Sequence, residues 1–172
     1  MPENLSLLPS SQPESSSKSP LSLKAIKITN PLFLGQIGPH IQTLNKRMNI
    51  AGITYETLYA YFVNVVQNGQ DMAEFWMAYE GDEPGAFACW MVKGSPFIGT
   101  VALDFAHSWM PNKALFSLLV DEYIKFGTKC RCPLYDGTTT SIKLFKHFQK
   151  IAEAKGLTFI ETTLKTFKAK KN

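Results

Sequence analysis

The hydrophobic residues of this chain recur with helical spacing in some segments and form short, strand-like runs in others. Helical spacing predicts helices over residues 37–48 and 142–152, from Thr54 to Gly69, and from about Pro111 to Lys129. Apolar runs bounded by Gly and Pro predict the strands. These predicted strands cover residues 23–28, 75–79, 86–92, 98–105, 133–136 and 157–167.

The predicted elements follow the order β-α-α-β-β-β-α-β-α-β. Three strands joined by short turns form an antiparallel meander, whereas the strand–helix–strand unit that follows favours parallel pairing. We therefore expect an α/β fold in which a mixed, mostly antiparallel twisted sheet carries helices on both faces.

Ser and Pro dominate the N-terminal end, because residues 1–20 hold seven Ser and four Pro, with three leucines as the main apolar side chains. Such a segment buries too little surface to offset the entropy of ordering it. We expect a disordered tail over residues 1–20 that becomes ordered against a protein partner, one domain over residues 21–167, and a basic end over residues 168–172. A homo-oligomer is an open alternative to a separate partner.

Charge and cysteine content narrow the class of protein. A net charge of +4 is below what dedicated nucleic-acid-binding domains carry, so nucleic acid is not the expected partner. No apolar run reaches the roughly 18 residues of a membrane span, and no signal pattern opens the chain, so we expect a cytoplasmic protein without membrane contact. An odd number of cysteines, Cys89, Cys130 and Cys132, favours reduced thiols and no metal site.

Two polar residues near the end of the predicted strand 98–105 are the candidate catalytic groups. Asp104 interrupts an apolar run and has the chemistry of a general base; the alternative is a carboxylate that faces solvent. His107 follows at an expected loop and is a candidate acid or base; the alternative is a surface or capping role. Asp136-Gly137 favours a turn before the last helix rather than a site.

The order of elements resembles the GNAT superfamily of N-acetyltransferases over about Leu21 to Phe167. Residues 76–87 are similar to the family's second and third strands, and residues 139–145 to its fifth-strand exit and fourth helix. The resemblance implies that acetyl-CoA binds where the fourth and fifth strands splay apart. It also implies that a Gly-rich loop at the start of the third helix holds the pyrophosphate. The cofactor-binding residues implied here are Leu103, Phe105, Lys113 and Ala114.

The chain departs from this family pattern in several places, among them Thr138 where the family often has Asn, and the lack of an obvious seventh strand. The loop over residues 108–114 contains no Gly, and Pro111 removes one N–H from the predicted first helical turn. Phe145 stands where the family often has a Tyr that protonates the leaving thiolate, and a Phe side chain has no proton to give. We therefore expect a degenerate acetyl-CoA site, no cofactor, and a role in interaction or assembly.

By analogy with GNAT-like proteins of tailed phages, this hypothesis extends to a phage origin and a place in the virion. The alternative is an acetyl-CoA-dependent N-acetyltransferase with a divergent site, in which Asp104 or His107 is the base.

Overall fold

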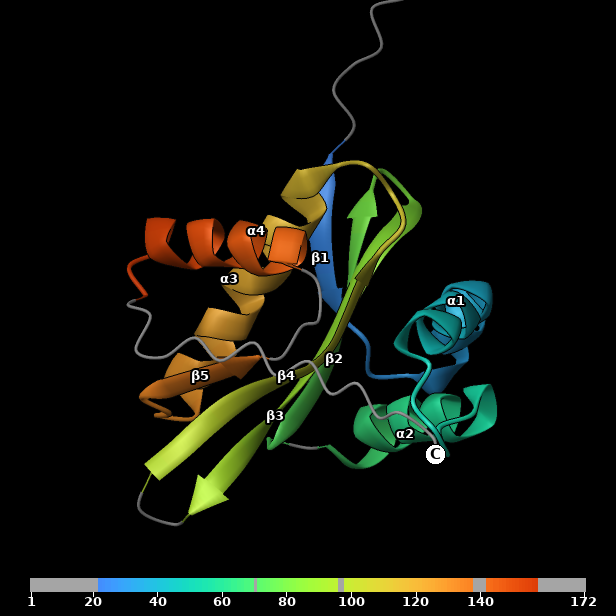
Figure 1. Cartoon of the computed structure of the whole chain (residues 1–172), viewed down its shortest axis with the longest axis horizontal. Coiled ribbons are helices and arrows are strands. Elements are labelled where there is room, and N and C mark those ends of the chain that lie inside the picture. The colour runs from blue at the N-terminus through green and yellow to red at the C-terminus, as the bar shows by residue number, and fades with distance from the viewer. Residues whose placement is uncertain (1–21, 70, 96–97, 138–141, 158–172) are drawn as a thin grey trace, which may run out of the picture.

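The structure, a computed structural model, describes residues 22–69, 71–95, 98–137 and 142–157, and places one sheet between two layers of helices (Figure 1). The predicted tail, the basic end and nearly all of the predicted strand 157–167 lie outside the described residues. In chain order the elements are β1 (Leu23–Lys27), the 3-10 helix η1 (Pro31–Ile37), α1 (Gly38–Met48), α2 (Tyr55–Asn68), β2 (Ala73–Glu80), β3 (Glu83–Ser95), β4 (Ile98–Ser108), α3 (Lys113–Lys129), β5 (Leu134–Gly137) and α4 (Ile142–Ala154).

The five described strands form one sheet in the order β1-β2-β3-β4-β5. Neighbouring strands are antiparallel from β1 to β4, and β5 runs parallel to β4. The predicted mixed, mostly antiparallel sheet is therefore confirmed. The prediction of a turn at Asp136-Gly137 is wrong, because helix α3 returns the chain alongside β4 and both residues pair there as the end of β5.

Two hydrophobic cores fill the spaces between the sheet and the helices. Helices α1 and α2 cover one face, where Phe62, Phe75 and Phe87 are fully buried. Helix α3 covers the opposite face, where Trp90 and Tyr123 are buried (Figure 1). Strand β3 lies between the two layers, and its side chains alternate from one core to the other. Within the described ranges, no helix combines the length and apolar character that a membrane crossing requires.

Side-chain caps set where α2 and α3 begin. Thr54 and Thr57 exchange hydrogen bonds at 3.2 Å and 2.9 Å, so the predicted cap at Thr54 is confirmed as a capping box. At α3, Asn112 Oδ1 accepts a hydrogen bond from the Ala114 N–H at 3.0 Å, and the helix begins at Lys113. The prediction of a start at Pro111 is wrong, because the Asn112 cap lies after it. Pro111 consequently removes no N–H from the first turn of α3.

Strand β4 contains a bulge at Asp104. In the pairing with β3, Leu103 lies opposite Trp90 while Phe105 lies opposite Cys89, which leaves Asp104 as the extra residue. Residues 103 and 105 share one face in a regular strand. Here Leu103 packs into the core under α3, whereas Phe105 packs into the core under α2.

The bulge also changes which face of the sheet the last side chains of β4 occupy. The His107 ring contacts the ring of Phe87 at a centroid distance of 5.9 Å, on the α1–α2 side of the sheet. Ala106 packs against the core under α3. The end of β4 therefore presents an imidazole to one helical layer and a small side chain to the other.

The Tyr123 hydroxyl joins β4 to β5 from helix α3. Its oxygen lies 2.6 Å from the Val101 carbonyl oxygen and 2.8 Å from that of Asp136, and it accepts a hydrogen bond from the Asp136 N–H at 3.1 Å. Only 1% of the residue is exposed. A single buried hydroxyl thus contacts the backbone of both parallel strands within their described pairing.

We expect Tyr123→Phe to lower the free energy of unfolding by about 1–3 kcal/mol, because the buried backbone groups of Asp136 and Val101 lose a hydrogen-bond partner. Urea denaturation followed by circular dichroism measures this change. Tyr59→Phe is the matched control, because no described residue hydrogen-bonds the Tyr59 hydroxyl. Equal losses in the two variants would show that the Tyr123 hydroxyl does not hold the strands.

Candidate functional site

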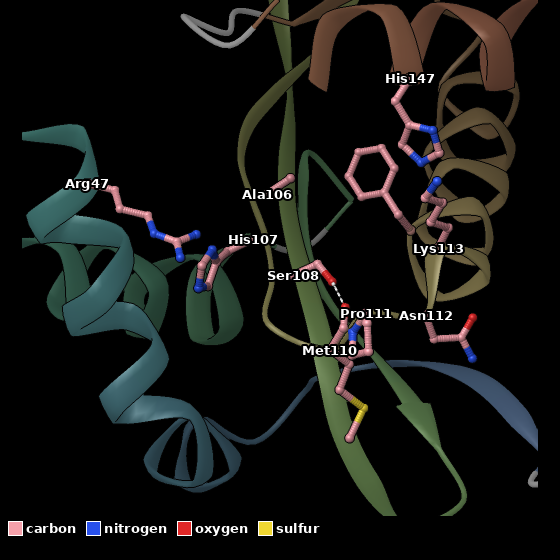
Figure 2. A pocket seen from close by; sticks show the side chains of 10 residues that line it. Arg47, Ala106, His107, Ser108, Met110, Pro111, Asn112, Lys113 and His147 are labelled. Carbon is pink, nitrogen blue, oxygen red and sulfur yellow. Dashed lines mark hydrogen bonds between the residues drawn. The ribbon is translucent and has the colours of Figure 1, made fainter. Parts of the chain in front are cut away.

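A cavity of about 270 Å³ lies at the end of β4, between the tip of the strand and the start of α3. Figure 2 shows Arg47 and His107 on one side of β4 and Asn112, Lys113 and His147 on the other. The cavity therefore reaches both faces of the sheet. Its lining residues are Arg47, Ala106, His107, Ser108, Met110, Pro111, Asn112, Lys113, Phe116 and His147.

The edge of β4 beside this cavity has no strand next to it in the described part of the chain. The described pairing with β5 runs from Thr100 to Leu103, β4 itself continues to Ser108, and residues 138–141, which follow β5, lie outside the described residues. The last described pair thus lies directly before the bulge, and a bulge bends the strand that carries it. Among the described residues, none pairs with the backbone groups of residues 104–108 on that edge, which is the kind of edge along which an extended ligand can pair.

The start of α3 forms the second wall of the cavity. Asn112 and Lys113 line it, and the side chain of Asn112 also donates a hydrogen bond to Glu80 at 3.1 Å. First-turn N–H groups and a lysine at a helix start favour an anion. Asn112 has an extended backbone, with φ −76° and ψ 102°, so this position does not require the left-handed freedom of Gly.

His107 is the most buried ionisable side chain of the lining. It is 6% exposed, and its Nε2 has no hydrogen-bond partner among the described residues. Burial lowers the pKa of His107 to about 4, with smaller contributions from the charges of Arg47 and His40. The ring is therefore neutral at pH 7, and a surface or capping role for His107 is wrong because the bulge turns it inward.

Asp104 is held away from the cavity by two partners. The Tyr61 hydroxyl donates to one carboxylate oxygen at 2.6 Å, and the Lys93 ammonium pairs with the other. Only 11% of the side chain is exposed, so the interpretation of Asp104 as a solvent-facing carboxylate is wrong; helix α2 covers that face. Both carboxylate oxygens of Asp104 have partners, and the residue does not line the cavity. Asp104 therefore links the bulge in β4 to helix α2 through Tyr61.

The residues that the resemblance implied for a cofactor divide into two groups. Lys113 lines the cavity, and Ala114 follows it with its N–H bonded to the Asn112 cap. Leu103 pairs with Gly137 of β5, and the side chain of Phe105 packs into the core under α2. Phe145 lies in α4, and its side chain is outside the described part of the structure.

Arg47 is a lining residue that sequence reasoning missed. It lies in the last turn of α1, whereas the rest of the cavity comes from β4, the loop between β4 and α3, α3 itself and α4. Basic residues are common in the last turn of a helix, so the local pattern carried no signal of a site. The side chain of Trp109 does not line the cavity, because its ring stacks on that of His40 at a centroid distance of 3.8 Å.

The lining as a whole is cationic or neutral. Arg47 and Lys113 bring two positive charges, two imidazoles come from His107 and His147, and no acidic side chain lines the cavity among the described residues. No group of three His, Cys, Asp or Glu side chains in the described ranges is placed to hold a metal ion. The cavity is therefore suited to an anionic ligand that meets a neutral imidazole.

No protein-family model matches this chain, and no curated protein matches its sequence. Solved structures do match its fold. Glucosamine-6-phosphate N-acetyltransferase from Arabidopsis thaliana is similar with a TM-score of 0.63 and 12% identity, over 85% of this chain and 98% of that one. A predicted acetyltransferase from Clostridium acetobutylicum, solved with acetyl-CoA, gives 0.61 and 11%, over 85% and 96%. An aminoglycoside N-acetyltransferase solved with CoA gives 0.58 and 16%, over 86% and 95%.

Proposed function

We propose that this chain, which has the GNAT fold, transfers an acyl group from an acyl-CoA, acetyl-CoA above all, to an amine in the cavity at the end of β4. One observation carries the proposal: the β4 edge beyond Leu103 lacks a described neighbouring strand and borders a cavity that reaches both faces of the sheet. A donor and an acceptor on opposite faces can meet only at such a gap.

The residues of the cavity fit an acyl-CoA. Backbone groups of residues 104–108 suit the amide groups of its pantetheine arm, because an extended chain pairs along an open strand edge. The start of α3 and Lys113 suit its pyrophosphate. Pro111 lies before the helix and takes no N–H from the first turn of α3; the N–H groups of Ala114 and Leu115 bond to Asn112, so Lys113, with its backbone N–H and its ammonium, is the main donor to the phosphates.

His107 is the residue that we assign to the acceptor amine. A neutral imidazole whose Nδ1 carries the hydrogen presents a lone pair at Nε2, and here that atom is buried without a described partner. The acyl-CoA supplies a thioester; the amine nitrogen bonds to its carbonyl carbon, the carbon–sulfur bond breaks, and the thiol leaves with a proton that the amine gives up. His107 accepts that proton from the amine and passes it on to the departing CoA thiolate, which leaves as the thiol, so that the imidazole is neutral again at the end of the step.

Amine acceptors also appear in the names of the similar structures, one a glucosamine 6-phosphate N-acetyltransferase and another an aminoglycoside N-acetyltransferase. These names support an amine as the acceptor class. The assembly role expected from the sequence stays a prediction, because residues 1–20, on which it depends, lie outside the described residues. No contact among the described residues favours it over acyl transfer.

We expect calorimetry to give a low-micromolar dissociation constant for acetyl-CoA, on the scale of about −8 kcal/mol. Lys113→Ala should weaken binding by about tenfold, because a charge-assisted contact to phosphate is lost. Lys125→Ala is the matched control, since Lys125 lies in the same helix, is exposed, and faces Glu122 rather than the cavity. The absence of binding at millimolar acetyl-CoA would overturn the proposed function and favour the assembly hypothesis.

A further inference from the structure

Arg47 is a cation of the cavity without a described partner. No ion pair or hydrogen bond joins its guanidinium to any residue that the structure describes. Figure 2 shows the guanidinium directed toward His107, across β4 from Lys113. The two positive charges of the cavity therefore lie on opposite sides of the strand.

His107 adds an independent observation on the side of Arg47. Its buried Nε2 has no described hydrogen-bond partner, although buried polar atoms in proteins are normally paired. A ligand on this side would meet a fixed positive charge from Arg47 and a neutral imidazole from His107. An amine with an anionic group on the same molecule offers both partners.

We infer that the acceptor is an amine that also carries a phosphate or carboxylate group, which Arg47 binds while the amine meets His107. The inference rests on the proposed function, in which the α3 side of the cavity holds the phosphates of the acyl-CoA and leaves Arg47 to the acceptor. A guanidinium presents a planar set of donors that matches phosphate and carboxylate oxygens.

The charges also exclude one class of acceptor. A polycationic amine would meet the charge of Arg47 on the acceptor side, and no acidic side chain of the described lining offsets it. An anion has a second effect, because the charge of Arg47 is one cause of the low pKa of His107. A phosphate or carboxylate bound to Arg47 neutralises that charge and makes His107 a stronger base at the moment when the amine is present.

The test compares matched amines on the chain saturated with CoA. Glucosamine 6-phosphate is compared with glucosamine, and β-alanine with β-alaninamide, so that phosphate and carboxylate are tested separately. Binding is followed by tryptophan fluorescence, to which Trp109 contributes from its position on His40 beside the cavity, and transfer by thiol release from acetyl-CoA. We expect the anionic member of at least one pair to bind at least about tenfold more tightly than its neutral counterpart.

Arg47→Gln should abolish this preference and leave acetyl-CoA binding within about twofold, while Arg47→Lys should restore part of it. Lys46→Gln is the control for net charge, because Lys46 is an exposed neighbour on α1 that does not line the cavity. Equal binding of the paired amines, tighter binding of the polycation sisomicin, or a preference that survives Arg47→Gln would overturn the inference while acetyl-CoA binding stands. Loss of acetyl-CoA binding in the parent chain would instead overturn the proposed function and the inference with it.

Discussion

His107→Gln is expected to lower kcat for acyl transfer by about 100-fold or more, because a glutamine amide cannot accept the proton of the attacking amine. Glutamine is close to histidine in size and keeps polar atoms in the cavity. Acetyl-CoA binding should therefore stay within about threefold of the parent chain. Initial rates of thiol release at saturating acetyl-CoA measure the loss.

A stability measurement checks the same variant without turnover. Because the folded chain lowers the pKa of His107 from 6.5 to about 4, the unfolded chain binds a proton that the folded chain does not between these values. The contribution of His107 to the free energy of unfolding should therefore be fully present above about pH 6.5, and the free energy of unfolding should fall by up to about 3 kcal/mol as the pH is lowered to 4. His107→Gln should remove the part of this slope that His107 contributes and leave the part that comes from His40, whose pKa burial also lowers, whereas Ser108→Ala, a lining variant that titrates nothing, should keep the whole slope.

One combination of results would contradict a role of His107 in acyl transfer. If His107→Gln removes its part of the pH slope but leaves kcat unchanged, the buried imidazole contributes to packing alone and takes no part in transfer. If both readouts change together, the neutral buried ring and the transfer step belong to the same residue.

Trp90→Ala is expected to lower the free energy of unfolding by about 3–5 kcal/mol, which is a large share of the stability of a domain of this size. Trp90 is fully buried, and its ring lies 5.6 Å from that of Tyr123 and 6.4 Å from that of Phe126. Its removal leaves a void under α3 next to the hydroxyl that joins β4 and β5. Chemical denaturation at pH 7 measures the change.

Trp90→Phe is the matched control for this prediction. The indole Nε1 of Trp90 is buried without a hydrogen-bond partner among the described residues, so its loss removes an unfavourable buried polar atom along with some contact area. We expect Trp90→Phe to cost less than half of what Trp90→Ala costs. Equal costs would mean that the indole itself, rather than the volume it fills, supports the core.

Most elements of the fold could be predicted from the sequence because their signals are local. The spacing of apolar residues located the four α-helices and the five described strands but not the 3-10 helix η1, and Thr54 marked the start of α2 through its side-chain cap. Errors arose where two local signals competed. At α3, Pro111 and Asn112 both open helices, and the side-chain hydrogen bond of Asn112 decides the boundary.

The candidate site could be predicted only in part, because its residues meet through tertiary structure. His107 was identified as a candidate, but a bulge that no sequence period reveals determines its burial. Asp136 combined with Gly137 is a frequent turn signal, and here parallel pairing with β4 overrides it. Arg47 lies in α1, which is separated from β4 in the sequence by α2, β2 and β3. Only the packing of α1 against the sheet brings its side chain to the cavity.

The bulge at Asp104 also bears on how insertions and deletions would act on this protein. Because Asp104 is the supernumerary residue opposite Trp90 and Cys89, a deletion of its single codon leaves every other β3–β4 partner unchanged. We expect the same deletion to straighten β4 beside the cavity, and it also removes the contacts of Asp104 with Tyr61 and Lys93. The shape of the cavity at the end of β4 therefore depends on a single residue that the β3–β4 pairing does not need.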